Sequence, residues 1–401
     1  MSSFIQNRKR KHALRLINAL INLFSVPKKL IAKKVDLKTF KPKKILALRL
    51  DYIGDVVMTS PALNVLRKKF PDAKILLITN TISKDFFDAD TAVDEVLTFN
   101  WPWPYHKSDN LFTYPKFKDL VLLIRRLRSE QIDMLVDFRG DLRFIILFGV
   151  LAGIKVRISN SRSGRTDLLA YSSIYDFNKH EVERAVDIVR CLDINTQEIR
   201  PKFVFHREET RIIIEKFKQE TGLSYPAKIA IVAPYSSKDV KSWPPEYFID
   251  VITYLKNKGY VVLVAGTKGE ATDAEKLLKN FDGSVYSFAG KTTVREMAAL
   301  IAVSNIIVGI DTGVLHLAAC FNIPIVAIFG PTRAIEFSPY SPNCTVVDLH
   351  SCRCNQFMHL KCDYPQQGYA ECLYQLKPER VIKVIEEVLQ AKSLDVNSGM
   401  N

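Results

Sequence analysis

Three short segments of the chain place charged or hydroxyl side chains next to a turn that follows an apolar run. The first is RLDYIGDVVMTSPAL (49–63), in which Gly54 and Asp55 stand between a predicted strand and a helical pattern. In open α/β sheets, ligands bind at the carboxyl ends of strands, and a glycine there lets an acceptor approach the backbone closely. Asp55 fits two roles, a helix cap and a general base, and its position alone leaves both open.

The second segment is YSSKDVKSWPPEYF (235–248), which follows the first apolar run of the second half of the chain. Ser236 and Ser237 offer hydroxyl groups, and Lys241 offers a cation. Hydroxyls and a lysine at a strand end suit a phosphate group. The alternative is a solvated loop with Trp243 in the core.

The third segment is IVGIDTGVLHLAACF (307–321), an apolar run, a turn at Asp311-Thr312-Gly313 and a helical pattern. The first amides of a helix bind anions, whereas Asp311 would repel an anion and suits the hydroxyls of a sugar. His316 falls close enough to reach the same ligand, although a lone histidine is more often structural. The segment therefore suits a ligand that joins hydroxyls to an anionic group.

The apolar runs that precede these segments predict the fold. Runs at 44–50 and 74–79 enclose a predicted helix over 61–70, which is a β-α-β unit and indicates a parallel sheet. Further strands are expected at 93–99, 134–138, 155–159, 228–233, 261–265, 285–287, 306–309 and 324–329, and helices at 117–130, 142–152, 181–192, 208–221 and 379–390. The prediction is an α/β protein with two doubly wound domains that face a cleft.

We expect four parts along the 401 residues: a basic arm over 1–42, one domain over 43–205, a second over 206–376, and a helix and tail over 377–401. The net charge of +14 belongs to the arm. Residues 1–44 hold 13 of the 57 Lys and Arg and one of the 43 acids, which leaves 44 bases against 42 acids in the rest. Because nucleic-acid binding needs basic residues spread over a folded face, we expect no nucleic-acid partner.

The arm has the spacing of an amphipathic helix. Its polar and basic positions recur every three or four residues, at Lys11, Arg15, Asn18, Asn22, Ser25 and Lys29, with apolar residues between them. The apolar stretch is too short to span a bilayer. We expect residues 8–34 to bind an anionic membrane surface as an interfacial helix. The alternative is a helix that packs on the body of the protein or a disordered segment.

Several partial motifs do not support other functions. GKTT (290–293) would need a glycine at Val285 to complete a P-loop, and no GxGxxG is present. Asp88-Ala89-Asp90 matches a metal-binding DxD in letters only, and we expect a solvated loop and no metal. Five cysteines gather near the end without a zinc-binding spacing, which favours thiols over a metal site: Cys344, Cys352, Cys354, Cys362 and Cys372.

Together the segments resemble glycosyltransferase family 9, the ADP-heptose:lipopolysaccharide heptosyltransferases. The resemblance rests on RLDYIGDVVMTSPALNVLRKKFPDA (49–73), VDFRGDLR (136–143), HEVERAVDIVRCL (180–192), KSWPPEYF (241–248), AGKTTVREMAALIA (289–302) and VGIDTGVLHLAACFNIPIVAIFGPT (308–332). It implies a GT-B fold of two Rossmann-like domains, an acceptor domain followed by a nucleotide-sugar domain. It also implies an inverting transfer that needs no metal or other cofactor.

The resemblance also implies roles for individual residues. Asp55 would be the general base, and Lys241 would support catalysis at the leaving diphosphate. The donor would be held by Ser236, Ser237, Lys241, Glu270, Lys291, Thr292, Asp311, Thr312, Gly313 and His316, with Glu270 at the ribose. The acceptor would meet Gly54, Arg162, Arg165 and Arg184. Asp51-Tyr52-Ile53 and the aromatic loop 99–115 depart from the family pattern, which points to a different acceptor mouth.

The predicted function is transfer of a sugar, heptose from ADP-heptose in the first place, to a lipid A–core type acceptor of a Gram-negative cell envelope. We expect the enzyme to be cytoplasmic and peripherally attached to the inner membrane. Two alternatives remain: a nucleotide-sugar epimerase of GT-B fold, which would form product from donor alone, and a non-catalytic membrane-associated scaffold. The presence of Asp55, Lys241 and Asp311 argues against the scaffold.

Overall fold

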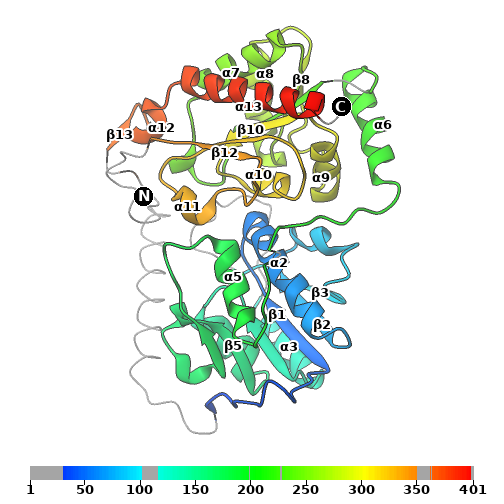
Figure 1. Cartoon of the computed structure of the whole chain (residues 1–401), viewed down its shortest axis with the longest axis vertical. Helices are drawn as coiled ribbons and strands as arrows, with labels where there is room; N and C mark the ends of the chain where they lie inside the picture. Colours follow the sequence, from blue (N-terminus) through cyan, green and yellow to red (C-terminus); the bar gives the residue numbers. More distant parts are fainter. Residues whose placement is uncertain are drawn as a thin grey trace.

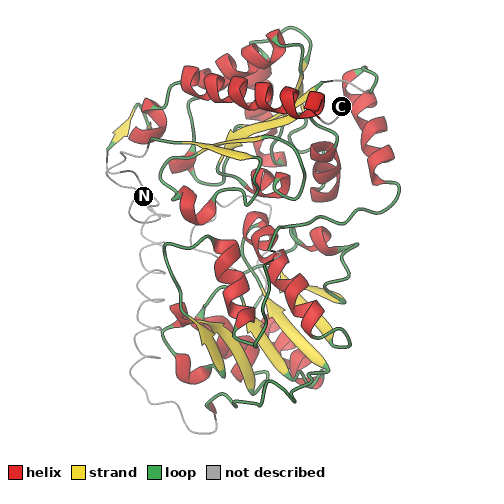
Figure 2. Cartoon of the chain, viewed as in Figure 1, coloured by secondary structure: helices red, strands yellow, loops and turns green. Residues whose placement is uncertain are grey.

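The computed structural model describes residues 30–101, 116–197, 199–225, 228–349, 362 and 364–398. Two α/β domains lie one above the other in Figure 1, and helices flank the strands of each domain in Figure 2. The predicted arm helix, most of the aromatic loop 99–115, and Cys352 and Cys354 lie outside the described residues. No described helix is long and apolar enough to cross a membrane.

The first domain is built on a six-stranded sheet of order β3-β2-β1-β4-β5-β6, in which all pairs are parallel. Its strands read as nearly continuous apolar runs because both faces are covered by helices. The strands are β1 (Lys44–Leu48), β2 (Lys74–Thr79), β3 (Glu95–Thr98), β4 (Met134–Asp137), β5 (Val156–Asn160) and β6 (Tyr171–Ser173), and the helices are α2 (Ile53–Lys69), α3 (Phe117–Ser129), α4 (Leu142–Phe144) and α5 (Glu181–Arg190).

The second domain repeats this plan with the sheet order β12-β11-β10-β7-β8-β9, again all parallel. Its strands are β7 (Ile229–Ala233), β8 (Val261–Val264), β9 (Val285–Ser287), β10 (Ile306–Ile310), β11 (Ile325–Ile328) and β12 (Cys344–Val347). Its helices are α6 (Glu209–Thr221), α7 (Pro245–Asn257), α8 (Ala271–Leu278), α9 (Val294–Ala302), α10 (Gly313–Ala318), α11 (Ala334–Phe337), α12 (Glu371–Gln375) and α13 (Pro378–Ser398). The predicted tail 377–401 contains α13, which packs against α7, β11 and β12 (Figure 1).

The helix predicted over 61–70 begins eight residues earlier, at Ile53, so that prediction of its start was wrong. Asp55 explains the early start, because its Oδ2 accepts a hydrogen bond from the backbone N–H of Tyr52 at 3.2 Å. Pro61 then lies inside the helix and cannot donate to the carbonyl of Val57. The hydroxyl of Ser60 donates to that carbonyl instead, at 2.8 Å, which makes the proline tolerable.

The structure differs from the sequence predictions at three smaller points. The helix predicted over 142–152 is α-helical only in α4 and continues as a π-helix over Ile145–Val150. The short strands β6 and β12 were not predicted. Asp88 is exposed as expected, but Asp90 is buried and accepts a hydrogen bond from the amide of Ala92 at 2.8 Å.

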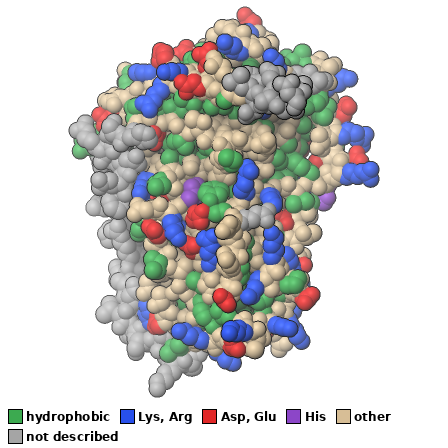
Figure 3. All heavy atoms as spheres, viewed as in Figure 1, with side chains coloured by type: hydrophobic (Ala, Val, Ile, Leu, Met, Phe, Trp, Pro, Cys, Tyr) green, Lys and Arg blue, Asp and Glu red, His purple; other side chains and the backbone are tan. Residues whose placement is uncertain are grey.

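The described part of the basic arm lies along the first domain. The N–H of Lys33 donates to the carbonyl of Lys155 at 2.9 Å, and Arg157 Nη2 donates to the carbonyl of Leu30 at 2.6 Å. On the face drawn in Figure 3, basic and acidic side chains are interspersed, in keeping with a nearly neutral body.

Candidate active site

A cleft of about 880 Å³ lies between the two domains. Its walls come from the segments that follow β1 and β4 in the first domain and β7, β8 and β10 in the second. These are the carboxyl ends of parallel strands, where doubly wound folds bind their ligands. The fold therefore brings the three sequence segments to one place.

On the second-domain side, Asp311 follows β10 and is buried. Burial alone would raise the pKa of this carboxyl, but the charge of Lys241, with which it forms an ion pair, and the proximity of His316 hold the pKa well below its usual range. His316 Nε2 lies 3.8 Å from Asp311 Oδ1, and its Nδ1 has no hydrogen-bond partner within the described chain. A charged pair and a buried imidazole with one unused nitrogen thus face the cleft.

The first turns of α2 and α10 meet across the cleft. A Cβ added to Gly54 would lie 2.6 Å from His316 Cδ2, and one added to Gly313 would lie 2.3 Å from Ile53 Cγ2. Both glycines are therefore required by the close approach of the two helices. His316 of the other domain fills the space beside Gly54. The absence of a side chain at Gly54 therefore allows the two domains to touch, and Gly54 also lines the cleft.

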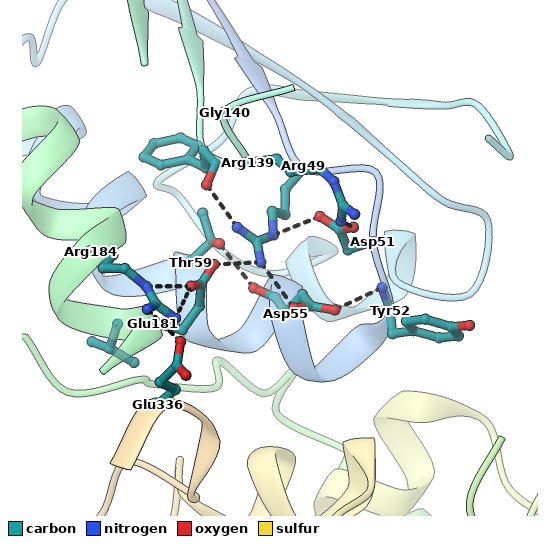
Figure 4. Close-up of polar contacts among 12 residues, drawn as sticks. Arg49, Asp51, Tyr52, Asp55, Thr59, Arg139, Gly140, Glu181, Arg184 and Glu336 are labelled. Carbon is teal, nitrogen blue, oxygen red and sulfur yellow. Dashed lines mark hydrogen bonds and ion pairs between the residues drawn. The ribbon is translucent and has the colours of Figure 1, made fainter. Parts of the chain in front are cut away.

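On the first-domain side, a buried arginine holds Asp55. Arg49 Nη2 donates to Asp55 Oδ1 at 2.9 Å, and Arg49 Nη1 donates to the carbonyl of Phe138 at 2.8 Å (Figure 4). The side chain of Asp55 is 24% exposed, whereas that of Arg49 is 3% exposed. Asp55 thus both caps α2 and presents a carboxylate to the cleft, so the two roles left open by the sequence are compatible.

Basic side chains line the rest of this wall. Arg139 pairs with the buried Asp51, and burial together with the charges of Arg162 and Arg49 lowers its pKa to about 9. Arg143 and Arg162 also line the cleft. Sequence reasoning gave no role to Arg49 and Arg139, and it named Asp51 only as a departure from the family pattern. The available signal was the presence of charges directly after the apolar runs of β1 and β4.

Most of the other predicted residues also line the cleft: Ser236, Ser237, Lys241, Glu270, Thr292, Thr312, Gly313, Gly54 and Arg162. Glu270 Oε2 accepts a hydrogen bond from the amide of Thr267 at 2.6 Å, which fixes the turn before α8.

Three predicted residues do not belong to the cleft lining. Lys291 points to Glu220, with an Nζ–Oε2 distance of 2.7 Å, and Arg165 pairs with Asp167 at 2.9 Å. Arg184 is buried between the domains and pairs with two glutamates. Because they pair with these carboxylates away from the cleft, the structure gives no support to a ligand role for them.

In the described ranges, no group of three or more His, Cys, Asp or Glu side chains is arranged to hold a metal ion. Burial raises the pKa of the Cys344 thiol to about 12 and keeps it protonated. Cys362 and Cys372 are buried near the hairpin that precedes α12.

Comparison with known proteins decides the family. The family model of glycosyltransferase family 9 (heptosyltransferase) matches residues 120–366, more than half of the chain. The chain belongs to glycosyltransferase family 9. Its architecture is the GT-B fold, and it is a glycosyltransferase.

Two related heptosyltransferases match over most of their length. Lipopolysaccharide heptosyltransferase 3 of Escherichia coli K12 is 23% identical over 73% of this chain and 84% of its own length. Lipooligosaccharide heptosyltransferase 2 of Campylobacter jejuni is 25% identical over 87% of this chain and 97% of its own. The solved structure of E. coli ADP-heptose lps heptosyltransferase II superposes with a TM-score of 0.70 and 20% identity, covering 87% of this chain and 99% of that one.

Proposed function

We propose that this family 9 glycosyltransferase transfers heptose from ADP-heptose to a hydroxyl of a lipopolysaccharide core acceptor, with inversion at the anomeric carbon. The observation that carries the proposal is the placement of the Asp55 carboxylate in the same cleft as Asp311 and Lys241. The names of the related enzymes supply the donor and the class of acceptor.

The acceptor hydroxyl would lie beside Asp55. Its oxygen attacks the anomeric carbon of the donor, the Asp55 carboxylate takes the hydroxyl proton, and the bond from the anomeric carbon to the diphosphate oxygen breaks. Arg49 orients the carboxylate by donating a hydrogen bond to Oδ1, while Oδ2 accepts one from the N–H of Tyr52 at the start of α2. A positioned general base of this kind contributes about 10²- to 10⁴-fold to a rate.

The donor would lie along the second domain. Lys241 and the hydroxyls of Ser236 and Ser237 would hold the diphosphate and stabilise its charge as it leaves as ADP. Asp311 would accept hydrogen bonds from the sugar hydroxyls, because its pKa is held low and it stays ionised. His316, whose Nδ1 has no hydrogen-bond partner within the described chain, would donate to the phosphate.

We also propose that residues 8–34 hold the enzyme on the anionic cytoplasmic surface of the inner membrane, where a lipid-linked acceptor is available. In the described part of this segment, Ile31, Lys33 and Lys34 are exposed, an apolar side chain beside two cations. Arg162, which lines the cleft, suits an acceptor that carries phosphate groups, and Arg143 lies beside it in an ion pair with Asp141.

The direct test incubates the full chain with ADP-heptose and a lipid A–core acceptor that lacks heptose. We expect release of ADP and formation of one new glycosidic bond whose anomeric configuration is opposite to that of the donor. ADP-heptose alone is the control. Conversion of the donor to an isomer without acceptor would support an epimerase instead, and absence of any nucleotide-sugar binding in calorimetry would support a non-catalytic scaffold.

A further inference from the structure

Arg184 connects the two domains. It lies on α5 of the first domain, is buried, and donates from Nη1 to Oε2 of Glu336 at 2.7 Å. Glu336 belongs to α11 of the second domain. From Nε, Arg184 donates to Oε2 of Glu181, one turn away on its own helix, at 2.8 Å. The guanidinium is thus shared between a carboxylate of each domain.

A continuous chain of charges leads from this contact to Asp55 (Figure 4). Glu181 Oε1 accepts a hydrogen bond from Arg49 Nη2 at 2.9 Å, and the same nitrogen donates to Asp55 Oδ1 at 2.9 Å. The order is Glu336, Arg184, Glu181, Arg49 and Asp55, with alternating sign. Because one nitrogen of Arg49 serves both carboxylates, a movement of Glu181 changes how Asp55 is held.

Burial makes this chain sensitive to the loss of one member. Burial raises the pKa of Glu181, but the charges of Arg49 and Arg184 outweigh it and keep the pKa below its usual value. Burial lowers the pKa of Arg184, but the charge of Glu181 outweighs it and the pKa is raised. Little water is available to replace a missing partner, so the remaining charges must rearrange among themselves.

Glu336 is itself fixed by the docking of the domains. Arg333 Nη1 donates to Glu336 Oε1 at 2.9 Å and to the carbonyl of Phe177, in the first domain, at 3.0 Å. A separate contact between the same two segments joins the hydroxyl of Tyr340 to Glu183 Oε1 at 2.7 Å. Among the described residues, that second contact has no hydrogen bond or ion pair to the series of charges that ends at Asp55, and it provides a matched control.

We propose that Glu336 is a positioning residue for the base and couples domain closure to catalysis. When the second domain docks, the carboxylate of Glu336 takes one edge of Arg184, and Arg184 then sets Glu181 and Arg49 so that Asp55 points into the cleft. When the domains separate, Arg184 turns wholly to Glu181 and the hold of Arg49 on Asp55 changes. The inference rests on the proposed function, because it takes Asp55 as the base.

The test compares Glu336→Gln with Tyr340→Phe in the full chain, using ADP-heptose and the heptose-deficient acceptor. Glutamine keeps the size of the side chain and removes its charge. We expect Glu336→Gln to lower kcat about 10-fold, equivalent to about 1.4 kcal/mol in the barrier. KM and the calorimetric affinity for ADP should stay within about twofold, because no substrate contact is removed. Tyr340→Phe should leave kcat within about twofold.

Two further variants separate positioning from loss of folding. Glu336→Asp restores the charge and should recover part of kcat. Arg184→Lys keeps the charge but cannot bridge two carboxylates as a guanidinium does, so it should lower kcat as Glu336→Gln does, and the double variant should lose no more than either single one. Thermal unfolding of each variant shows whether it is folded at the assay temperature.

The proposal is overturned if folded Glu336→Gln keeps the wild-type kcat, if Tyr340→Phe lowers kcat equally, or if the effect appears in KM alone. These results differ from a failure of the proposed function. In that case the wild-type chain would not transfer heptose, or Asp55→Asn would retain the wild-type rate.

Discussion

Replacement of Gly54 by alanine tests the close contact between the domains. The added methyl group would lie 2.6 Å from Cδ2 of His316, about 1 Å closer than ordinary van der Waals contact. Because His316 is buried and packed, relief requires either a rotated imidazole or a wider separation of α2 and α10. Overpacking of this size costs about 1–3 kcal/mol. Alanine in a helix recovers up to about 1 kcal/mol relative to glycine.

A double-mutant cycle with His316 separates the steric cost of the added methyl group from its gain in helix propensity. In the wild-type chain, Gly54→Ala should lower the free energy of unfolding, or leave it unchanged where the overpacking cost and the helix gain cancel. In the His316→Ala variant, Gly54→Ala should raise it, since the methyl group then has room. The coupling energy from denaturant unfolding should be about 1–3 kcal/mol. Gly269→Ala is the control, because the nearest atom to its added methyl group lies at 3.8 Å. A coupling energy near zero would refute the contact between Gly54 and His316.

Three further predictions concern other parts of the molecule. His180 accepts from Val182 N at Nδ1 and donates from Nε2 to the carbonyl of Ser338, and burial lowers its pKa to about 4. As pH falls, the unfolded chain therefore takes up the His180 proton before the folded chain does. The free energy of unfolding should fall between about pH 6.5 and pH 4, by up to about 2 kcal/mol at pH 5. His180→Gln should reduce this pH dependence in thermal unfolding. Lys241→Met leaves Asp311 buried without its cation, so calorimetry should show ADP affinity reduced by at least about 10-fold, and retention of full affinity would remove Lys241 from the phosphate site. Deletion of residues 1–29, which keeps Ile31, Lys33 and Lys34, should strongly weaken binding to vesicles of anionic lipid while transfer to a detergent-solubilised acceptor continues. Unchanged vesicle binding would contradict the role of the arm.

The fold and much of the cleft were predictable because they depend on local patterns. The apolar runs KILAL and KILLIT identify buried parallel strands. The strand-end rule places Asp55 at the edge of one sheet and Lys241 and Asp311 at the edge of the other, on the two walls of the cleft. The family resemblance was confirmed by the family model. The start of α2 was misplaced because Pro61 indicates a helix beginning, and nothing local shows that Ser60 compensates for its missing N–H.

The charge chain could not be predicted for a different reason. Arg49 and Glu181 are 132 residues apart, and Arg184 meets Glu336 over 152 residues. The first contact depends on how distant segments of the first domain pack together, and the second on how the two domains dock. Neither leaves a periodic pattern in the sequence. The family resemblance aligns Arg184 with acceptor-binding arginines, but it does not show that Arg184 pairs with Glu181 and Glu336.

The proposed reaction depends on removal of the acceptor hydroxyl proton by Asp55. Asp55→Asn should lower kcat for heptose transfer from ADP-heptose by about 10²- to 10⁴-fold, with the calorimetric affinity for ADP unchanged. Asp85→Asn, a carboxyl in the same cleft that is given no part in the reaction, is the control and should retain the wild-type rate. A wild-type kcat in Asp55→Asn, or an equal loss in both variants, would show that Asp55 is not the general base.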